Sequence, residues 1–184
     1  MKVREVIKDA ARLIGDEGLY SALGDETTAL TDENKKKADV MLKCYNDAQY
    51  EVATKRMPLI AEEIFSGGKI LYKSFKHTPS KILKVSKNGE NVNCEIYADY
   101  LTSKFGKIAV KYEYIPADKS INDDFDYANT KIGKVPFAYA VAASYCLITG
   151  RFSESKNWES RFSEYLETSP KKYSGRIKNK RIWR

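Results

Sequence analysis

The 184-residue sequence contains few of the residues that enzymes use for metal binding or nucleophilic catalysis. It has a single histidine, His77, and its three cysteines, Cys44, Cys94 and Cys146, are far apart and form no CxxC pair. A structural zinc site needs four such ligands, so the sequence favours no zinc centre. The odd cysteine count argues against a disulfide framework, and we expect each cysteine to be a small buried apolar residue.

Catalytic and phosphate-binding motifs are also lacking. The sequence contains no GxSxG, and "SGGK" at 66–69 does not have the GxxxxGK[ST] spacing of a phosphate loop. "DDFD" at 123–126 groups three carboxylates, but no EF-hand spacing follows, so a solvated loop is the favoured interpretation over a cation site. We expect no cofactor and an exposed, inert His77. A hydrolase with paired carboxylates stays open, because acidic residues can meet in any fold.

No hydrophobic run is long enough to cross a membrane. The longest stretch without charge, "VPFAYAVAASYCLITG" at 135–150, is shorter than the ~20 residues that a span requires. The first fifteen residues, "MKVREVIKDAARLIG", mix charged and apolar side chains and therefore do not resemble a signal peptide. The sequence thus predicts a protein of the cytoplasm without a membrane partner.

An excess of charge is absent from most of the chain. The net charge of +7 equals the number of Lys and Arg residues in "KKYSGRIKNKRIWR" at 171–184, a stretch without any acidic residue. The other 25 basic residues match the 25 acidic ones, so positions 1–170 are neutral. A general nucleic-acid-binding face would spread its cations over the folded surface. We call residues 171–184 the C-terminal arm and expect it to insert into an acidic partner or onto phosphates.

Hydrophobic periodicity predicts helices at both ends of the chain. Residues 3–14 have apolar positions at helical spacing, and Gly15 is a stop signal. Residues 15–30 look like a turn-rich connection, after which Thr31 is a candidate N-cap for a helix that continues to Pro58. Residues 135–149 are apolar on nearly every side and predict a central helix. Ser153 is a candidate cap for the next helix, in which Trp158, Phe162, Tyr165 and Leu166 share a face.

The middle of the chain changes to a period of two. "LIAEEIF" and "ILYKSF" flank Gly67 and Gly68, which predicts a hairpin turn, and Asn88-Gly89 is a second hairpin signal. In "GKIAVKYEYIP" at 106–116, apolar residues alternate with charged ones as in a half-buried antiparallel strand. Residues 59–116 therefore predict a β module of four to six strands with a small core of its own.

These elements predict an α+β fold, namely an antiparallel helical bundle with an inserted antiparallel β module and an extended basic C-terminal tail. The expected order is two helices, the sheet, two helices and the arm. The corresponding divisions are a first helical part at 1–58, the β module at 59–119, a second helical part at 120–170, and the arm at 171–184.

Four stretches together resemble a known family. They are "MKVREVIKDAARLIGDE", "MLKCYNDAQYEVATKRMPL", "VPFAYAVAASYCLITGRFSESKNWESRFSEYL" and the closing "KNKRIWR". The combination is similar to the head–tail adaptor (connector) proteins of tailed bacteriophages, including the tail tubular protein A group of short-tailed phages. The resemblance covers roughly 1–60 and 133–184, whereas the β segment matches only loosely.

The resemblance implies a structural virion protein of the neck or tail that is not an enzyme. Such adaptors form a ring, usually of twelve copies, beneath the portal at the capsid vertex, and genomic DNA passes through the lumen without sequence-specific binding. The helical part packs against neighbouring subunits, the C-terminal segment reaches the portal protein, and the β part faces the next tail or nozzle protein.

Two sets of residues follow from this interpretation. Ile182 and Trp183 are apolar anchors that we expect to bind the portal, since tryptophan is a frequent hot-spot residue, while nearby cations steer the arm. The complete portal-binding set is Arg176, Lys178, Lys180, Arg181, Ile182, Trp183 and Arg184. A loop predicted at 98–107 and the two hairpin turns are expected to face the tail, through Gly67, Gly68, Asn88, Gly89, Tyr100 and Phe105.

A second function class also fits parts of the sequence. Tyrosine is abundant, with 13 residues, and Tyr97, Tyr100, Tyr112 and Tyr114 all lie in the predicted β module. Tyrosines that alternate with lysines on an open sheet can stack on the bases of single-stranded nucleic acid. The alternative is therefore a basic-tailed nucleic-acid-binding module. Because the body is neutral, the sequence favours protein–protein contact.

Overall fold

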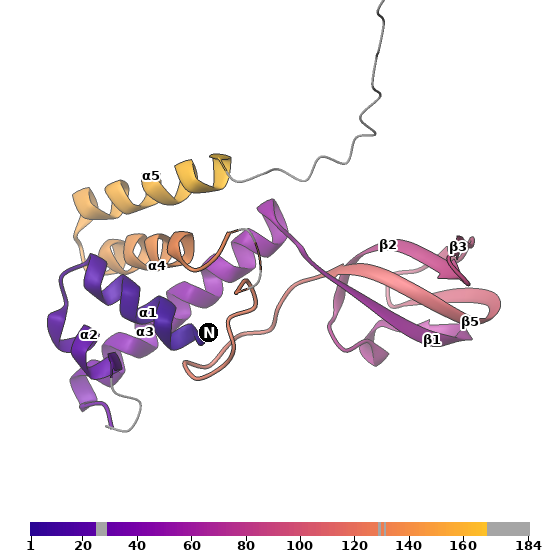
Figure 1. The fold of residues 1–184 in the computed structure, drawn as a ribbon, viewed down its shortest axis with the longest axis horizontal. Helices are drawn as coiled ribbons and strands as arrows, with labels where there is room; N and C mark the ends of the chain where they lie inside the picture. The colour runs from indigo at the N-terminus through magenta and orange to yellow at the C-terminus, as the bar shows by residue number, and fades with distance from the viewer. Residues whose placement is uncertain (25–28, 129, 131, 169–184) are drawn as a thin grey trace, which may run out of the picture.

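The structure, a computed structural model, describes residues 1–24, 29–128, 130 and 132–168. These residues form five α-helices and one five-stranded antiparallel sheet, so the α+β class predicted from the sequence is confirmed. The helices and the sheet lie end to end, joined by the start of strand β1 and by the segment that returns after strand β5 (Figure 1).

Helix α1 spans Val3–Leu13, and its apolar stripe lies in the core of the helical part. Its first turn has no side-chain cap, and main-chain groups of a distant loop take that place. The N–H groups of Val3 and Arg4 donate to the carbonyls of Asp123 and Ile121 at 3.0 and 2.9 Å, and the Phe125 N–H donates to the Met1 carbonyl at 3.0 Å. Phe125 is itself buried. "DDFD" is therefore a structural loop that holds the start of α1.

Helix α2 spans Glu17–Gly24. The sequence prediction of a turn-rich connection in this region is therefore wrong. Gly15 ends α1 with a φ of 75°, as expected of a glycine stop. The next residue, Asp16, begins a new helix because its Oδ1 accepts a hydrogen bond from the Leu19 N–H at 3.0 Å. Leu19 and Leu23 are fully buried. The first helical part therefore contains three helices where two were predicted.

Replacing Asp16 by alanine is expected to lower the free energy of unfolding by about 1 kcal/mol or somewhat more, through loss of the α2 cap. Asp16 also pairs with Lys37 at 3.0 Å. Burial alone would raise the pKa of Asp16, but the Leu19 N–H and Lys37 lower it below its ordinary value. Its stabilising effect is thus present above about pH 4 and is lost as the pH falls.

Urea unfolding at neutral and acidic pH measures this effect. Asp16→Asn is the matched control, because asparagine caps equally well but cannot pair with Lys37. If Asp16→Ala were as stable as the parent at neutral pH, the assigned cap would be wrong.

Helix α3 spans Asp32–Glu51 and continues into a single π-helical turn, Val52–Arg56. Thr31 is its N-cap, as predicted, since the Thr31 Oγ1 accepts a hydrogen bond from the Asn34 N–H at 3.3 Å. Pro58 follows this helix, and the first strand begins directly after it. The position of the change from helix to sheet was therefore predicted correctly.

Helices α4, Val135–Ile148, and α5, Phe152–Thr168, form the rest of the helical part. Helix α4 packs against α1, α3 and α5, so the prediction of a central helix is confirmed. The prediction that Ser153 caps α5 is wrong, because Ser153 lies inside the helix. Arg151 is the residue directly before α5. Its guanidinium binds Glu154 and donates to the Ile14 carbonyl at 2.9 Å. This arrangement fixes the start of α5 against the end of α1.

The sheet has the strand order β1-β5-β2-β3, with β4 paired to the first part of β5. Its strands are β1, Leu59–Leu71; β2, Pro79–Lys87; β3, Glu90–Asn91; β4, Glu95–Ile96; and β5, Tyr100–Tyr114, and a 3₁₀ turn at Tyr72–Ser74 follows β1. Five strands agree with the predicted four to six. The Asn88-Gly89 hairpin is confirmed, with φ values of 52° and 87° at the two turn residues.

The predicted hairpin turn at Gly67 and Gly68 is wrong. Strand β1 runs straight through both glycines, and its register against β5 shifts there, since Ser66 pairs with Lys107 whereas Gly68 pairs with Ser103. Gly67 therefore faces the three residues 104–106 in a β-bulge. Gly68 has a φ of 96°. A glycine pair serves a bulge as well as a turn, because both need a backbone that side chains disfavour.

The two parts of the fold have separate hydrophobic cores. The larger core lies among the helices and includes Phe125, Tyr127 and Phe137. The smaller lies in the β module and consists of Ile70, Phe75, Val85, Leu101, Ile108, Val110 and Tyr112. The expectation that the β module has a core of its own is therefore confirmed.

Candidate interaction surfaces

The predicted portal-binding residues, Arg176 to Arg184, lie outside the described residues. The structure does give the place from which the arm departs, because α5 ends at Thr168 as the last described residue. All contacts described below concern the helical part and the β module.

Three of the predicted tail-facing residues meet at the bulge. Gly67 lies directly against the main chain of Phe105, and Gly68 follows in the same bulge. The Asn88-Gly89 turn is close to them, because the Lys87 Nζ lies over the Phe105 ring, 5.4 Å from its centre. Gly67, Gly68, Phe105 and the Asn88-Gly89 turn thus form one cluster, which we call the bulge end of the β module. No local pattern in the sequence indicated that they would be adjacent.

The prediction of a loop at 98–107 is wrong, because Tyr100 and Phe105 both lie within strand β5. Tyr100 stacks on Tyr97 with ring centres 4.5 Å apart and planes 19° apart, and the Lys69 Nζ lies 4.0 Å from the Tyr100 ring centre. The Tyr97 hydroxyl donates to Glu95 at 3.0 Å, and this bond raises the pKa of Tyr97. The pair is a surface aromatic site beside a cation.

Only part of the proposed tyrosine platform is accessible. Tyr112 is fully buried, and its hydroxyl bonds to Glu63; burial and this carboxylate raise the pKa of Tyr112 to about 12. Tyr114 stacks on His77, with ring centres 4.1 Å apart. His77 is therefore half-buried against a ring, where the sequence predicted an exposed position. Tyr97 and Tyr100 are left as the stacked pair that could meet a base.

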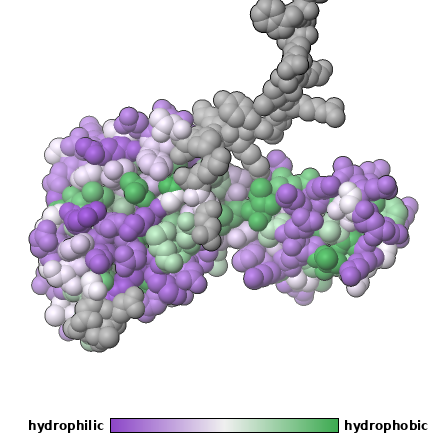
Figure 2. Space-filling model, in the orientation of Figure 1, coloured by the Kyte–Doolittle hydropathy of each residue, from purple (hydrophilic) through white to green (hydrophobic). Residues whose placement is uncertain are grey.

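The edge of strand β1 is a surface that the sequence analysis missed. Among the described residues, no strand pairs with β1 on the side away from β5. Ile60 and Ile64 on this strand are 41% and 64% exposed. Figure 2 shows hydrophobic residues on the visible face of the β module both near its junction with the helical part and near its far end. A long strand edge with exposed isoleucines is a template for pairing with another chain.

The connection between α4 and α5 carries a second exposed apolar group. Leu147, Ile148 and Phe152 are 57%, 64% and 63% exposed. We call these three residues the α4–α5 patch. Their exposure was not predicted, because the sequence of α4 is apolar on almost every side.

The cysteine, histidine and carboxylate side chains are spread through the described part of the chain. There, no group of three or more His, Cys, Asp or Glu side chains is placed to hold a metal ion. Cys44 and Cys146 are buried, as predicted, while Cys94 is half-buried. Burial and the nearby Asp47 raise the pKa of Cys44 to about 11, so this thiol stays protonated at neutral pH. Within the described ranges, no helix is long and apolar enough to cross a membrane.

A scan against known protein families finds no match to this chain, and a search of curated proteins finds no similar sequence.

Proposed function

We propose that this chain is a structural head–tail adaptor of a tailed bacteriophage that assembles as a ring, usually of twelve copies. The ring joins the portal at the capsid vertex to the tail and surrounds the passage for DNA. The observation that carries the proposal is the division into two separately packed parts lying end to end, each with exposed apolar residues. Such a molecule is suited to contact different partners at its two ends.

The edges of the sheet support a ring of copies. The outer edge of β1 is free, and so is the outer edge of residues 79–84 in β2, because β3 pairs only with Ser86 and Lys87 among the described residues. Contact between two different edges in neighbouring copies is heterologous, and repeated heterologous contact generates a ring when the rotation closes. Exposed Ile60 and Ile64 add apolar area to this contact.

The two ends then have different partners. The helical bundle and the arm meet the portal, with Ile182 and Trp183 as anchors and the arm's cations as steering charges. The bulge end of the β module meets the next tail or nozzle protein through Phe105 and the Asn88-Gly89 turn. The protein catalyses no reaction in this role and acts in the neck or tail of the virion.

Analytical ultracentrifugation with and without the portal protein tests this proposal. We expect a monomer or weak oligomer alone, and co-sedimentation as one large species when the portal is added. An unchanged sedimentation profile in the presence of portal would count against the adaptor function.

A second candidate is a nucleic-acid-binding module, favoured by the stacked Tyr97–Tyr100 pair with Lys69 over the Tyr100 ring. Base stacking on such rings contributes about 1–3 kcal/mol per base. Binding of random single-stranded DNA by the isolated chain at several salt concentrations separates the two functions. The module predicts strong, salt-dependent binding that falls in Tyr97→Ala, whereas the adaptor predicts weak binding that this change leaves unaltered.

A further inference from the structure

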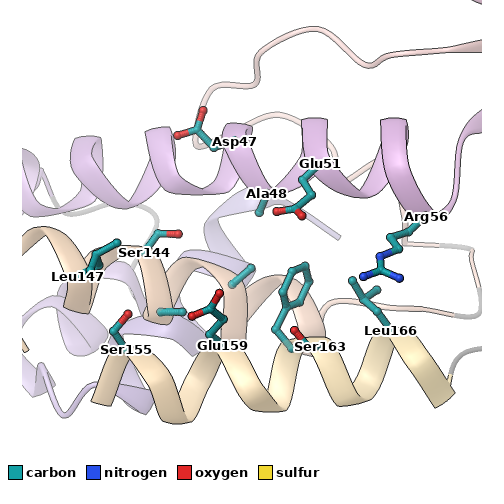
Figure 3. A pocket seen from close by; sticks show the side chains of 13 residues that line it. Asp47, Ala48, Glu51, Arg56, Ser144, Leu147, Ser155, Glu159, Ser163 and Leu166 are labelled. Carbon is teal, nitrogen blue, oxygen red and sulfur yellow. The ribbon is translucent and has the colours of Figure 1, made fainter. Parts of the chain in front are cut away.

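A groove runs along the helical part between α3 and α5, with α4 as its floor (Figure 3). Its volume is about 220 Å³. The floor and lower walls are apolar or small, and include Ala48, Ala140, Ala143 and Phe162. Glu51 from α3 and Glu159 from α5 point into the space between the two helices from opposite sides. The groove therefore combines an apolar base with two facing carboxylates.

The lining of the groove is negatively charged. Asp47, Glu51 and Glu159 line it, and Arg56 is the cation among the lining residues. Glu51 pairs with Lys55 at 3.3 Å, whereas Asp47 and Glu159 have no ion pair or side-chain hydrogen bond to any described residue. Carboxylates that face each other in this way attract a cation placed between them.

The two ends of the groove differ. Leu147 lines one end, and the rest of the α4–α5 patch, Ile148 and Phe152, follows it in sequence. Arg56 and Leu166 lie at the other end (Figure 3). Helix α5 ends at Thr168, two residues beyond Leu166. The chain therefore leaves α5 at the Leu166 end of the groove, opposite the α4–α5 patch.

The composition of the C-terminal arm complements these features. The arm has seven cations and no acidic residue, and it contains Ile182 and Trp183. The groove follows α5 from Leu166 back to Ser155, which is about 16 Å at 1.5 Å per residue. An extended chain covers that length with about five residues. The arm is thus long enough to follow the groove and to bring Ile182 and Trp183 to the α4–α5 patch.

We propose that residues 171–184 dock in the α3–α5 groove of their own chain. Basic side chains of the arm lie between Glu51 and Glu159, and Ile182 with Trp183 covers the α4–α5 patch. This contact stands on the groove and the arm alone and does not depend on the adaptor function. Where the arm also binds a portal, docking is a latch that the portal must displace.

The tether makes docking within one chain favourable. A short linker between two binding groups gives them an effective concentration of about 1 mM. A contact with a dissociation constant below that value therefore keeps most of the arm docked, and free copies at micromolar concentration do not compete. Contact with a second copy would instead depend on protein concentration.

Tryptophan fluorescence tests the docking directly, because the chain has two tryptophans, Trp158 and Trp183. In Trp158→Phe, Trp183 is the single reporter. We expect its emission at a shorter wavelength, and its quenching by acrylamide weaker, than in a synthetic peptide of residues 171–184. Adding Glu51→Lys and Glu159→Lys should return both signals to the peptide values.

Glu62→Lys with Glu90→Lys is the matched control, since it makes the same charge change at exposed positions of the β module. It should leave the Trp183 signals unchanged. Peptide-like Trp183 signals in the Trp158→Phe chain would overturn the proposal, as would equal effects of the two double changes. If the Trp183 signals became peptide-like on dilution, the arm would dock on another copy and not on its own chain.

Limited trypsin digestion of the chain with both tryptophans gives a second measurement, which does not depend on Trp158→Phe remaining folded. Docking should slow cleavage within 171–184 several-fold relative to the Glu51→Lys, Glu159→Lys chain. Equal cleavage rates in these two chains would also overturn the proposal.

Discussion

Gly67→Ala is expected to unfold the β module while the helices stay folded. A methyl group at Gly67 would coincide with the main-chain oxygen of Phe105 on the opposite strand. The obstacle is backbone within a paired strand, so it cannot be relieved by rotation of a side chain. We expect a loss of about 3 kcal/mol or more, at or above the upper end of overpacking costs.

Two neighbouring glycines are controls for this change. Gly106→Ala meets open space and should be nearly neutral. Gly68→Ala also meets open space, but its φ of 96° should cost about 1–2 kcal/mol. Amide hydrogen exchange gives the readout, with protection lost in β1 and β5 and retained in α1, α3 and α4. Equal loss in the helices would show that the two cores unfold as one unit.

Removing the arm is expected to have the largest effect on function. Deletion of residues 171–184 should leave the circular dichroism of the chain almost unchanged, because α5 ends at Thr168, and should lower the melting temperature only slightly, by loss of the docked arm. Attachment to the portal should fall sharply. Trp183→Ala alone should cost about 2 kcal/mol or more per subunit, and the loss is compounded when many copies bind together.

Changing Arg176, Lys178, Lys180 and Arg181 together to Gln separates the charges from the anchor. These changes keep Ile182 and Trp183, so they should mainly slow association and reduce its dependence on salt. Portal association followed at several salt concentrations distinguishes the two variants. If Trp183→Ala attached as well as the parent while the charge variant lost DNA binding, the arm would be a nucleic-acid-binding segment.

The helices were largely predictable because their signals are local. Apolar spacing within residues 3–14 and the Thr31 cap each lie within a few turns of chain, and the structure places both as expected. Helix α2 was missed because its sequence is short and glycine-flanked, although Asp16 with Leu19 three residues later was a readable cap. Ser153 was a misleading cap signal, since Arg151 and Gly150 fix the start of α5 two residues earlier, at Phe152.

The sheet was less predictable because its decisive contacts are distant in sequence. Gly67 and Gly68 suit a turn and a bulge equally, and only pairing with residues about 37 positions away distinguishes the two. The same reason explains why Tyr100 and Phe105 were assigned to a loop. The α3–α5 groove depends on Glu51 and Glu159, which are more than 100 residues apart, so no local pattern could indicate it.

Electron microscopy of the chain mixed with the portal protein tests the central proposal most directly. The adaptor function predicts a ring of copies on one face of the portal, with a central channel and the β modules directed away from the portal. The ring should be missing from mixtures made with the chain that lacks residues 171–184. Portal particles without added density at a saturating concentration of the intact chain would contradict the account.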